Sequence, residues 1–98
     1  MKLEIIDYAT DVSPYCKALV LRDDDLHERV EFYEVGCEGK VYEKIESGLY
    51  LIDYFSCGGG GCGSAIYGNL MALREKKVIV KVYEGEKMVS CDVLRCCE

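Results

Sequence analysis

The sequence contains no tryptophan and no glutamine, and it has a single proline, a single asparagine and a single histidine, His27. With one imidazole, a hydrolytic metal site built from several histidines is excluded, and a Cys–His nucleophile would have to use His27. His27 follows a run of acidic residues, where a neighbouring carboxylate would suit it to general acid chemistry. A solvated histidine in a loop is the simpler interpretation, and we favour it.

Long apolar runs are also missing. No stretch approaches the roughly 18 uncharged apolar residues of a membrane span, and residues 1–7 carry an acid every few positions in place of the apolar core of a secretory signal. We therefore expect a soluble protein that is made and kept in the cytoplasm, which for a viral protein is that of the host cell, and that does not contact a membrane.

Basic residues are outnumbered and scattered. The sequence has twelve Lys and Arg residues and eighteen Asp and Glu residues, which gives a net charge of −6, and no segment gathers the basic residues together. A chain that tracks phosphates needs such a cluster. The sequence therefore predicts no nucleic-acid binding, and its charge suits solubility or attraction to a basic protein surface.

The lack of glutamine, beside abundant glutamate and lysine, is typical of hyperthermophiles. Seven cysteines in 98 residues agree with this interpretation, because hyperthermophiles are the recognised exception among cells that keep their thiols reduced. We expect a thermophilic or viral origin. Seven is an odd number, so at least one cysteine is free, oxidised or paired between chains, and Cys97 is the candidate for a bond between chains.

The chain is long enough for one hydrophobic core and too short for two, so we expect a single domain over residues 1–98. Runs rich in β-branched and aromatic residues predict seven short strands, over 3–8, 15–22, 29–35, 40–45, 48–55, 77–83 and 88–94. Residues 36–39 suit a hairpin turn between the third and fourth runs. Residues 84–87 suit one between the last two, where Val78, Val80 and Val82 share one face.

A helix is predicted near residues 64–76, because Ile66, Leu70 and Leu73 recur at helical spacing and Ser64 can cap the first turn. The sequence therefore predicts an α+β fold, a mainly antiparallel β-sheet of about six or seven short strands with one helix. An all-β sandwich or a partly open barrel is the alternative. Asp23, Asp24 and Asp25 repel one another and predict a solvated loop, and Asp53 interrupts the most apolar run, which we assign to the core.

The most unusual stretch is residues 56–64, in which four consecutive glycines lie between Cys57 and Cys62. Four glycines are costly to order, so we expect a cross-link. The disulfide candidates are Cys57, Cys62, Cys96 and Cys97. We predict that Cys57 or Cys62 is oxidised in the folded protein, because closing so free a loop removes unfolded-state entropy.

Two other interpretations of this stretch stay open. Four thiolates hold Zn²⁺ tetrahedrally, and the metal-ligand candidates are Cys57, Cys62, Cys91, Cys96 and Cys97. Gly58, Gly60 and Gly63 also match the spacing of a dinucleotide-binding loop between a strand and a helix. Against that match, any glycine run satisfies a glycine motif, and one such unit lacks the second half of a dinucleotide crevice.

The sequence has no catalytic set and no convincing cofactor motif. We therefore predict a small non-enzymatic interaction or regulatory protein that binds a protein partner through an acidic, tyrosine-bearing sheet face. Homodimerisation through an edge strand is expected as well, since an open sheet leaves unpaired backbone groups. The alternatives are a cysteine-rich zinc-binding or thiol-regulated module, and a small nucleotide-binding enzyme that uses the loop from Gly58 to Gly63.

Overall fold

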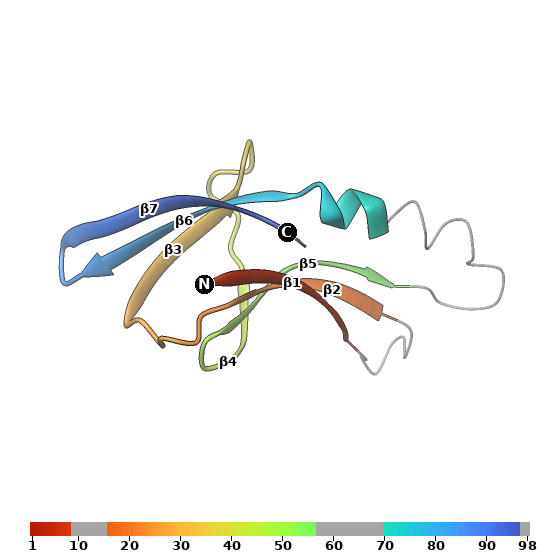
Figure 1. Cartoon of the computed structure of the whole chain (residues 1–98), viewed down its shortest axis with the longest axis horizontal. Coiled ribbons are helices and arrows are strands. Elements are labelled where there is room, and N and C mark those ends of the chain that lie inside the picture. The colour runs from red at the N-terminus through yellow and green to blue at the C-terminus, as the bar shows by residue number, and fades with distance from the viewer. Residues whose placement is uncertain (9–15, 57–69, 97–98) are drawn as a thin grey trace, which may run out of the picture.

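The computed structural model describes residues 1–8, 16–56 and 70–96. Within them the chain forms seven strands in two stacked sheets and one short helix (Figure 1). The strands are β1 (Lys2–Asp7), β2 (Cys16–Arg22), β3 (Arg29–Glu34), β4 (Glu43–Glu46), β5 (Leu49–Ser56), β6 (Lys77–Glu84) and β7 (Lys87–Arg95). No helix in these ranges is long and apolar enough to cross a membrane.

The two sheets differ in strand order. One sheet has four strands in the order β1-β2-β5-β4, and the other has three in the order β3-β6-β7, with every pairing antiparallel. The mainly antiparallel fold with one helix is therefore confirmed. The helix is described over residues 70–74, where Leu70 and Leu73 pack against the core as their spacing predicts, and residues 64–69 lie outside the described ranges.

The core lies between the two sheets because each contributes an apolar inner face. Val78 and Val80 of β6 are buried while Lys77 points outward, which is the two-residue period of a strand with one wet face. They meet Leu19 and Leu21 of β2, both fully buried. Burial of each such leucine contributes about 1.5–3 kcal/mol.

Three aromatic rings close the core beside β4. Phe32 of β3 stacks on Tyr42 with ring centroids 4.7 Å apart and meets Tyr50 of β5 edge-on at 5.0 Å. The Tyr42 hydroxyl accepts a hydrogen bond from the Glu34 backbone N–H at 2.7 Å. Burial raises the pKa of Tyr42 above 10.0, so the hydroxyl stays neutral. This contact fixes the connection from β3 to β4.

The predicted hairpin between residues 29–35 and 40–45 is wrong. β3 pairs with β6 and β4 pairs with β5, so the two segments belong to different sheets and residues 35–42 cross between them. The turn that β4 uses is the tighter one after Glu46, in which Gly48 takes a φ of +77°. A left-handed glycine favours a short turn between antiparallel strands.

An ionic cluster joins the two sheets. Glu34, at the end of β3, is 5% exposed and accepts Lys40 at 3.2 Å and Lys76 at 2.9 Å. Lys76, just before β6, also reaches Asp53 of β5 at 3.1 Å. The hydrogen bond that Lys76 donates to Glu34 and the pair with Asp53 raise the pKa of Lys76 above 10.5. Asp53 thus lies on an interior strand, where it has an ion-pair partner.

Candidate functional site

The three-stranded sheet turns one face away from the core, upward in Figure 1. The residues on this face alternate along each strand with the buried ones, and the register sets them side by side across β3, β6 and β7. We call this surface the outer face. It comprises Arg29, Glu31, Tyr33, Val35, Lys77, Ile79, Lys81, Tyr83, Met88, Cys91, Val93 and Arg95.

The charge of the outer face opposes that of the whole chain. The outer face carries one acidic side chain, that of Glu31, and four basic ones, those of Arg29, Lys77, Lys81 and Arg95. The chain as a whole, in contrast, carries a net charge of −6. The acidic, tyrosine-bearing face expected from the sequence is therefore not what this sheet carries. The basic residues come from three strands and share a face only through the register, so they form no cluster in the sequence.

Two of the cations lie over tyrosine rings. The Arg29 guanidinium carbon is 4.3 Å from the centroid of Tyr83, and the Lys81 Nζ is 5.4 Å from the centroid of Tyr33. Glu31 bonds Arg29 at 3.0 Å and accepts the Tyr83 hydroxyl at 3.2 Å. These contacts are exposed, so they order the side chains while adding little stability.

The shifted pKa values of Glu31 and Lys81 keep both side chains charged at neutral pH. Hydrogen bonds from Arg29 and Tyr83 lower the pKa of Glu31 below 4.5. The neighbouring Tyr33 and Tyr83 raise the pKa of Lys81 above 10.5. Both ions are therefore present throughout the physiological range.

Exposed apolar side chains complete the outer face. Met88 is 48% exposed, and Val35 and Val93 are each 57% exposed. Single exposed apolar residues are ordinary, but several beside ordered tyrosine and arginine side chains have the composition of a protein interface. Cys91 lies among them and is exposed.

A second polar arrangement lies in the connection from β2 to β3. His27 Nδ1 lies 2.9 and 3.0 Å from the two carboxylate oxygens of Asp23, and the His27 backbone N–H donates to Asp23 Oδ2 at 2.8 Å. Asp23 is 1% exposed. The expectation of a solvated loop is therefore wrong for Asp23 and right for Asp24 and Asp25, which are exposed.

The physical reason is that Asp23 acts as a cap for the loop. Its backbone N–H donates to the Gly48 carbonyl at 2.7 Å, which pins the loop to the β4–β5 turn, and its carboxylate satisfies His27. The four-residue spacing from Asp23 to His27 was the available signal, since a carboxylate commonly bonds backbone groups a few residues ahead.

Asp23, Asp25 and His27 also form a group of metal-ligand atoms that lie within 4.8 Å of one another, and among the described residues no other such group of three occurs. Both carboxylate oxygens of Asp23 already accept hydrogen bonds from His27. The group is therefore explained by the structure of the loop.

Some of the cysteines singled out in the sequence lie within the described residues, and the others lie outside them. Cys91 lies on the outer face and Cys96 is buried in the core, so the two lie on opposite sides of the three-stranded sheet and are not brought together. Cys37 is exposed, and no disulfide joins described residues. Cys57, Cys62 and Cys97 lie outside the described residues, as does the loop from Gly58 to Gly63. The disulfide, zinc and nucleotide interpretations stay predictions.

Comparisons of the chain with protein families, with curated proteins and with solved structures find no match. The outer face and the surroundings of His27 are therefore the features from which a function can be inferred.

Proposed function

We propose that this protein is a non-enzymatic interaction module whose outer face binds an acidic surface of a protein partner. The observation that carries the proposal is the concentration of four basic and three exposed apolar side chains around two ordered tyrosines on one sheet face. Tyrosine and arginine supply much of the energy of protein interfaces, and complementary charge speeds and orients the encounter.

A protein partner fits this surface better than a nucleic acid does. The cations over Tyr33 and Tyr83 occupy ring faces that would otherwise stack on bases. Met88 and Val93 have apolar surface that phosphates do not cover. The rest of the chain is acidic and would repel a long phosphate backbone. A compact acidic patch on a protein partner would contact only the outer face.

Self-association is the second candidate. β7 has nine residues and, among the described strands, pairs only with β6, so one edge is available to a second copy. β4, at the edge of the other sheet, is short and carries Glu43, Lys44 and Glu46, which disfavour strand addition. Light scattering at increasing concentration tests this candidate against the monomer mass of 11.0 kDa.

Charge reversal tests the proposed partner. We expect the double variant Lys81→Glu, Arg95→Glu to lose captured protein at least about tenfold relative to wild type in affinity capture from native-host extract. The matched control is Lys2→Glu, Lys44→Glu, which makes the same change in net charge at exposed positions of the other sheet. The control variant should retain the partner, and rising salt should weaken capture by wild type.

The identity of the captured molecule decides the result. An acidic protein that is lost only from the outer-face variant supports the proposal. Equal loss or equal retention by the two double variants would contradict it, and so would capture that disappears after nuclease treatment.

A further inference from the structure

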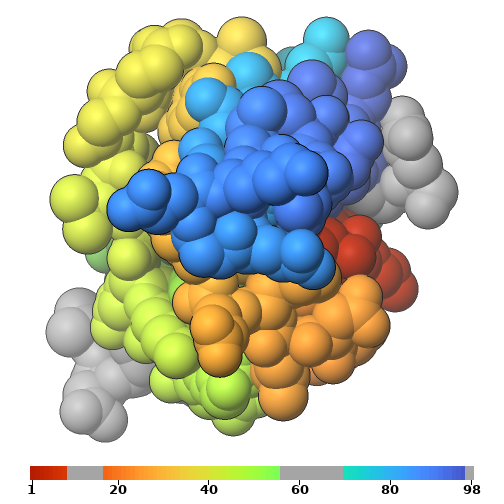
Figure 2. Space-filling model, turned by 90° about the vertical axis from the view of Figure 1, so that its left-hand side faces the viewer, coloured from red at the N-terminus to blue at the C-terminus, as the bar shows by residue number. Residues whose placement is uncertain are grey.

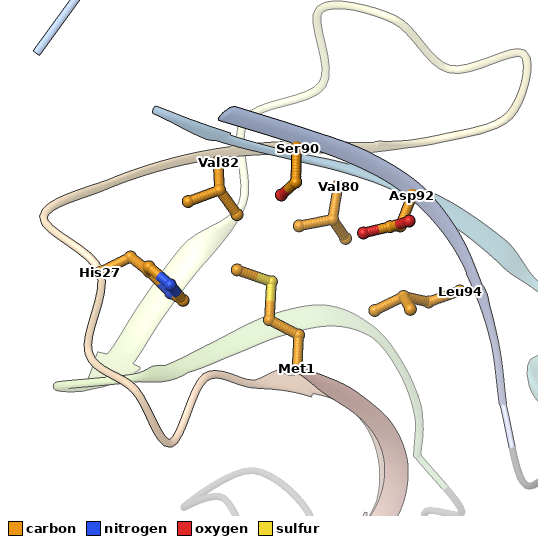
Figure 3. A pocket seen from close by; sticks show the side chains of 7 residues that line it. All are labelled: Met1, His27, Val80, Val82, Ser90, Asp92 and Leu94. Carbon is orange, nitrogen blue, oxygen red and sulfur yellow. The ribbon is translucent and has the colours of Figure 1, made fainter. Parts of the chain in front are cut away.

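A cavity of about 200 Å³ opens between the two sheets at the end that carries the β6–β7 turn. Figure 2 faces this end, where that turn, the β2–β3 connection and the β4–β5 turn come together. The cavity is lined by the residue that precedes β1, by the β2–β3 connection and by β6 and β7: Met1, His27, Val80, Val82, Ser90, Asp92 and Leu94. Figure 3 shows Met1 rising from one wall and the β6 and β7 side chains descending from the other.

The polar groups on the β7 wall are held by the register of the sheet. Ser90 pairs with Val82 and Asp92 pairs with Val80, whose side chains are buried, so both polar residues face inward. Cys91, between them, faces outward. The cavity is therefore separate from the outer face, although β7 contributes to both.

The tautomer of His27 is fixed by its partner. Because a carboxylate accepts hydrogen bonds, the Asp23 oxygens at 2.9 and 3.0 Å require the proton of a neutral imidazole to be on Nδ1. Nε2 then carries the lone pair and is a hydrogen-bond acceptor. Asp23 is buried, so the ring is held in place beside the cavity.

Asp92 and Ser90 are the other two polar residues that line the cavity, and both can accept hydrogen bonds. The Asp92 carboxylate accepts hydrogen bonds and makes no ion pair within the described part of the chain, and the Ser90 hydroxyl accepts as well as donates. Among the described residues, no Lys or Arg side chain lines the cavity, and the other lining side chains are apolar. A ligand that suits this lining has a positive charge, several N–H donors and a short apolar body.

We propose that this cavity binds a primary ammonium group carried on a short alkyl chain. The ammonium donates to the Asp92 carboxylate and the Ser90 hydroxyl, while the alkyl chain contacts Val80, Val82 and the side chain of Met1 on the way toward His27. A small alkylamine and a lysine side chain of another protein share this chemistry. A charge-assisted hydrogen bond to Asp92 supplies most of the selectivity over a neutral or anionic ligand.

NMR titration of the full chain tests the proposal with defined probes. We expect n-butylammonium to shift the methyl signals of Val80 and Val82 and the ring signals of His27 in a saturable way, with half-saturation on the order of 1–10 mM. Butyrate and n-butanol, which match the alkyl chain without the charge, should leave these signals unchanged. Equal shifts with all three compounds, or none with n-butylammonium, would overturn the proposal.

A second probe identifies the source of the ammonium group. Nα-acetyl-lysine methylamide carries the lysine side chain without a free α-amine. Binding at least as tight as that of n-butylammonium assigns the site to a lysine of another protein. Weaker binding assigns it to free amines.

Variants confirm the location. Asp92→Asn should weaken n-butylammonium binding at least about tenfold, because the charge of the acceptor is lost while its shape is kept. Glu86→Gln, in the exposed turn of the same hairpin, is the matched control and should leave binding unchanged. Both positions are exposed, so both variants should fold, which their backbone amide spectra check. Equal affinities of Asp92→Asn and wild type would show that the cavity does not hold the ammonium group.

Discussion

Replacing Gly48 by alanine is expected to lower the free energy of unfolding by about 2–5 kcal/mol. Gly48 has a φ of +77°, and a Cβ there would lie 2.5 Å from the Asp23 carbonyl oxygen and 2.7 Å from Leu26 Cδ2. Alanine at this position must therefore adopt a left-handed conformation. The β2–β3 connection and the β4–β5 turn, which are hydrogen-bonded to each other, must also move apart. Urea denaturation followed by circular dichroism measures the loss.

Gly85 offers the matched control for this substitution. Its φ is +61°, and a Cβ there would meet nothing within 4 Å. Gly85→Ala should therefore cost only the left-handed conformation, about 1–2 kcal/mol. Because Asp23 holds His27, Gly48→Ala should also shift the imidazole NMR signals, whereas Gly85→Ala should not. Equal losses from the two substitutions would contradict the close packing of the β2–β3 connection on Gly48.

Replacing Lys76 by methionine is expected to lower the free energy of unfolding at pH 7 by about 1–3 kcal/mol. Methionine keeps much of the length and the apolar stem. Among the described residues, however, the Glu34 carboxylate then keeps only Lys40 as an ion-pair partner, and Asp53 loses its ion pair with Lys76. Lys77→Met is the matched control, since the neighbouring lysine is exposed and makes no ion pair with any residue that the structure describes. The control should change stability by less than about 0.5 kcal/mol.

The pH dependence of this difference has a defined sign. The pKa of Lys76 is raised in the folded protein by its hydrogen bond to Glu34, so its contribution is fully present below the ordinary value of 10.5 and is lost as the pH rises through the folded value. The stability difference between wild type and Lys76→Met should therefore be constant from pH 7 to about 10 and shrink above pH 10.5. A difference that grows at high pH would contradict the assigned ion pairs.

Much of the fold followed from local sequence pattern. In β6 the valines alternate with exposed residues, and residues 84–87 supply a turn, so both the strand and its hairpin with β7 were predictable. The run ending at Phe55 is apolar on both faces, and β5 indeed lies between β2 and β4 inside its sheet. Such features depend on neighbours in sequence, which pattern reasoning handles well.

Features that depend on distant pairing were not predictable in the same way. The glycines at 36 and 39 favoured a local hairpin, but β3 instead pairs with a strand more than forty residues later. That choice packs Phe32 against the core and buries Glu34, and tertiary packing of this kind overrides a local turn preference. Asp23 was misjudged for a related reason, because its burial depends on Gly48 from another turn.

The basic character of the outer face was not predictable either, because it also depends on the pairing of distant strands. Arg29, Lys81 and Arg95 come from three strands, and only the antiparallel register sets them on one surface. In the sequence each of the three is flanked by acidic or apolar residues, so none of them stands next to another basic residue. The net charge of −6 is that of the whole chain, but it led to the expectation of an acidic sheet face, whereas the outer face is basic.

Site-specific photo-crosslinking tests the central claim, that the outer face is where the partner binds. A photoreactive amino acid at Val93 lies on the outer face, and one at Tyr54, which is 54% exposed, lies on β5 of the other sheet. In cells of the native host, we expect one dominant crosslinked acidic protein from position 93 and none from position 54. No product from position 93, or the same products from both positions, would contradict it.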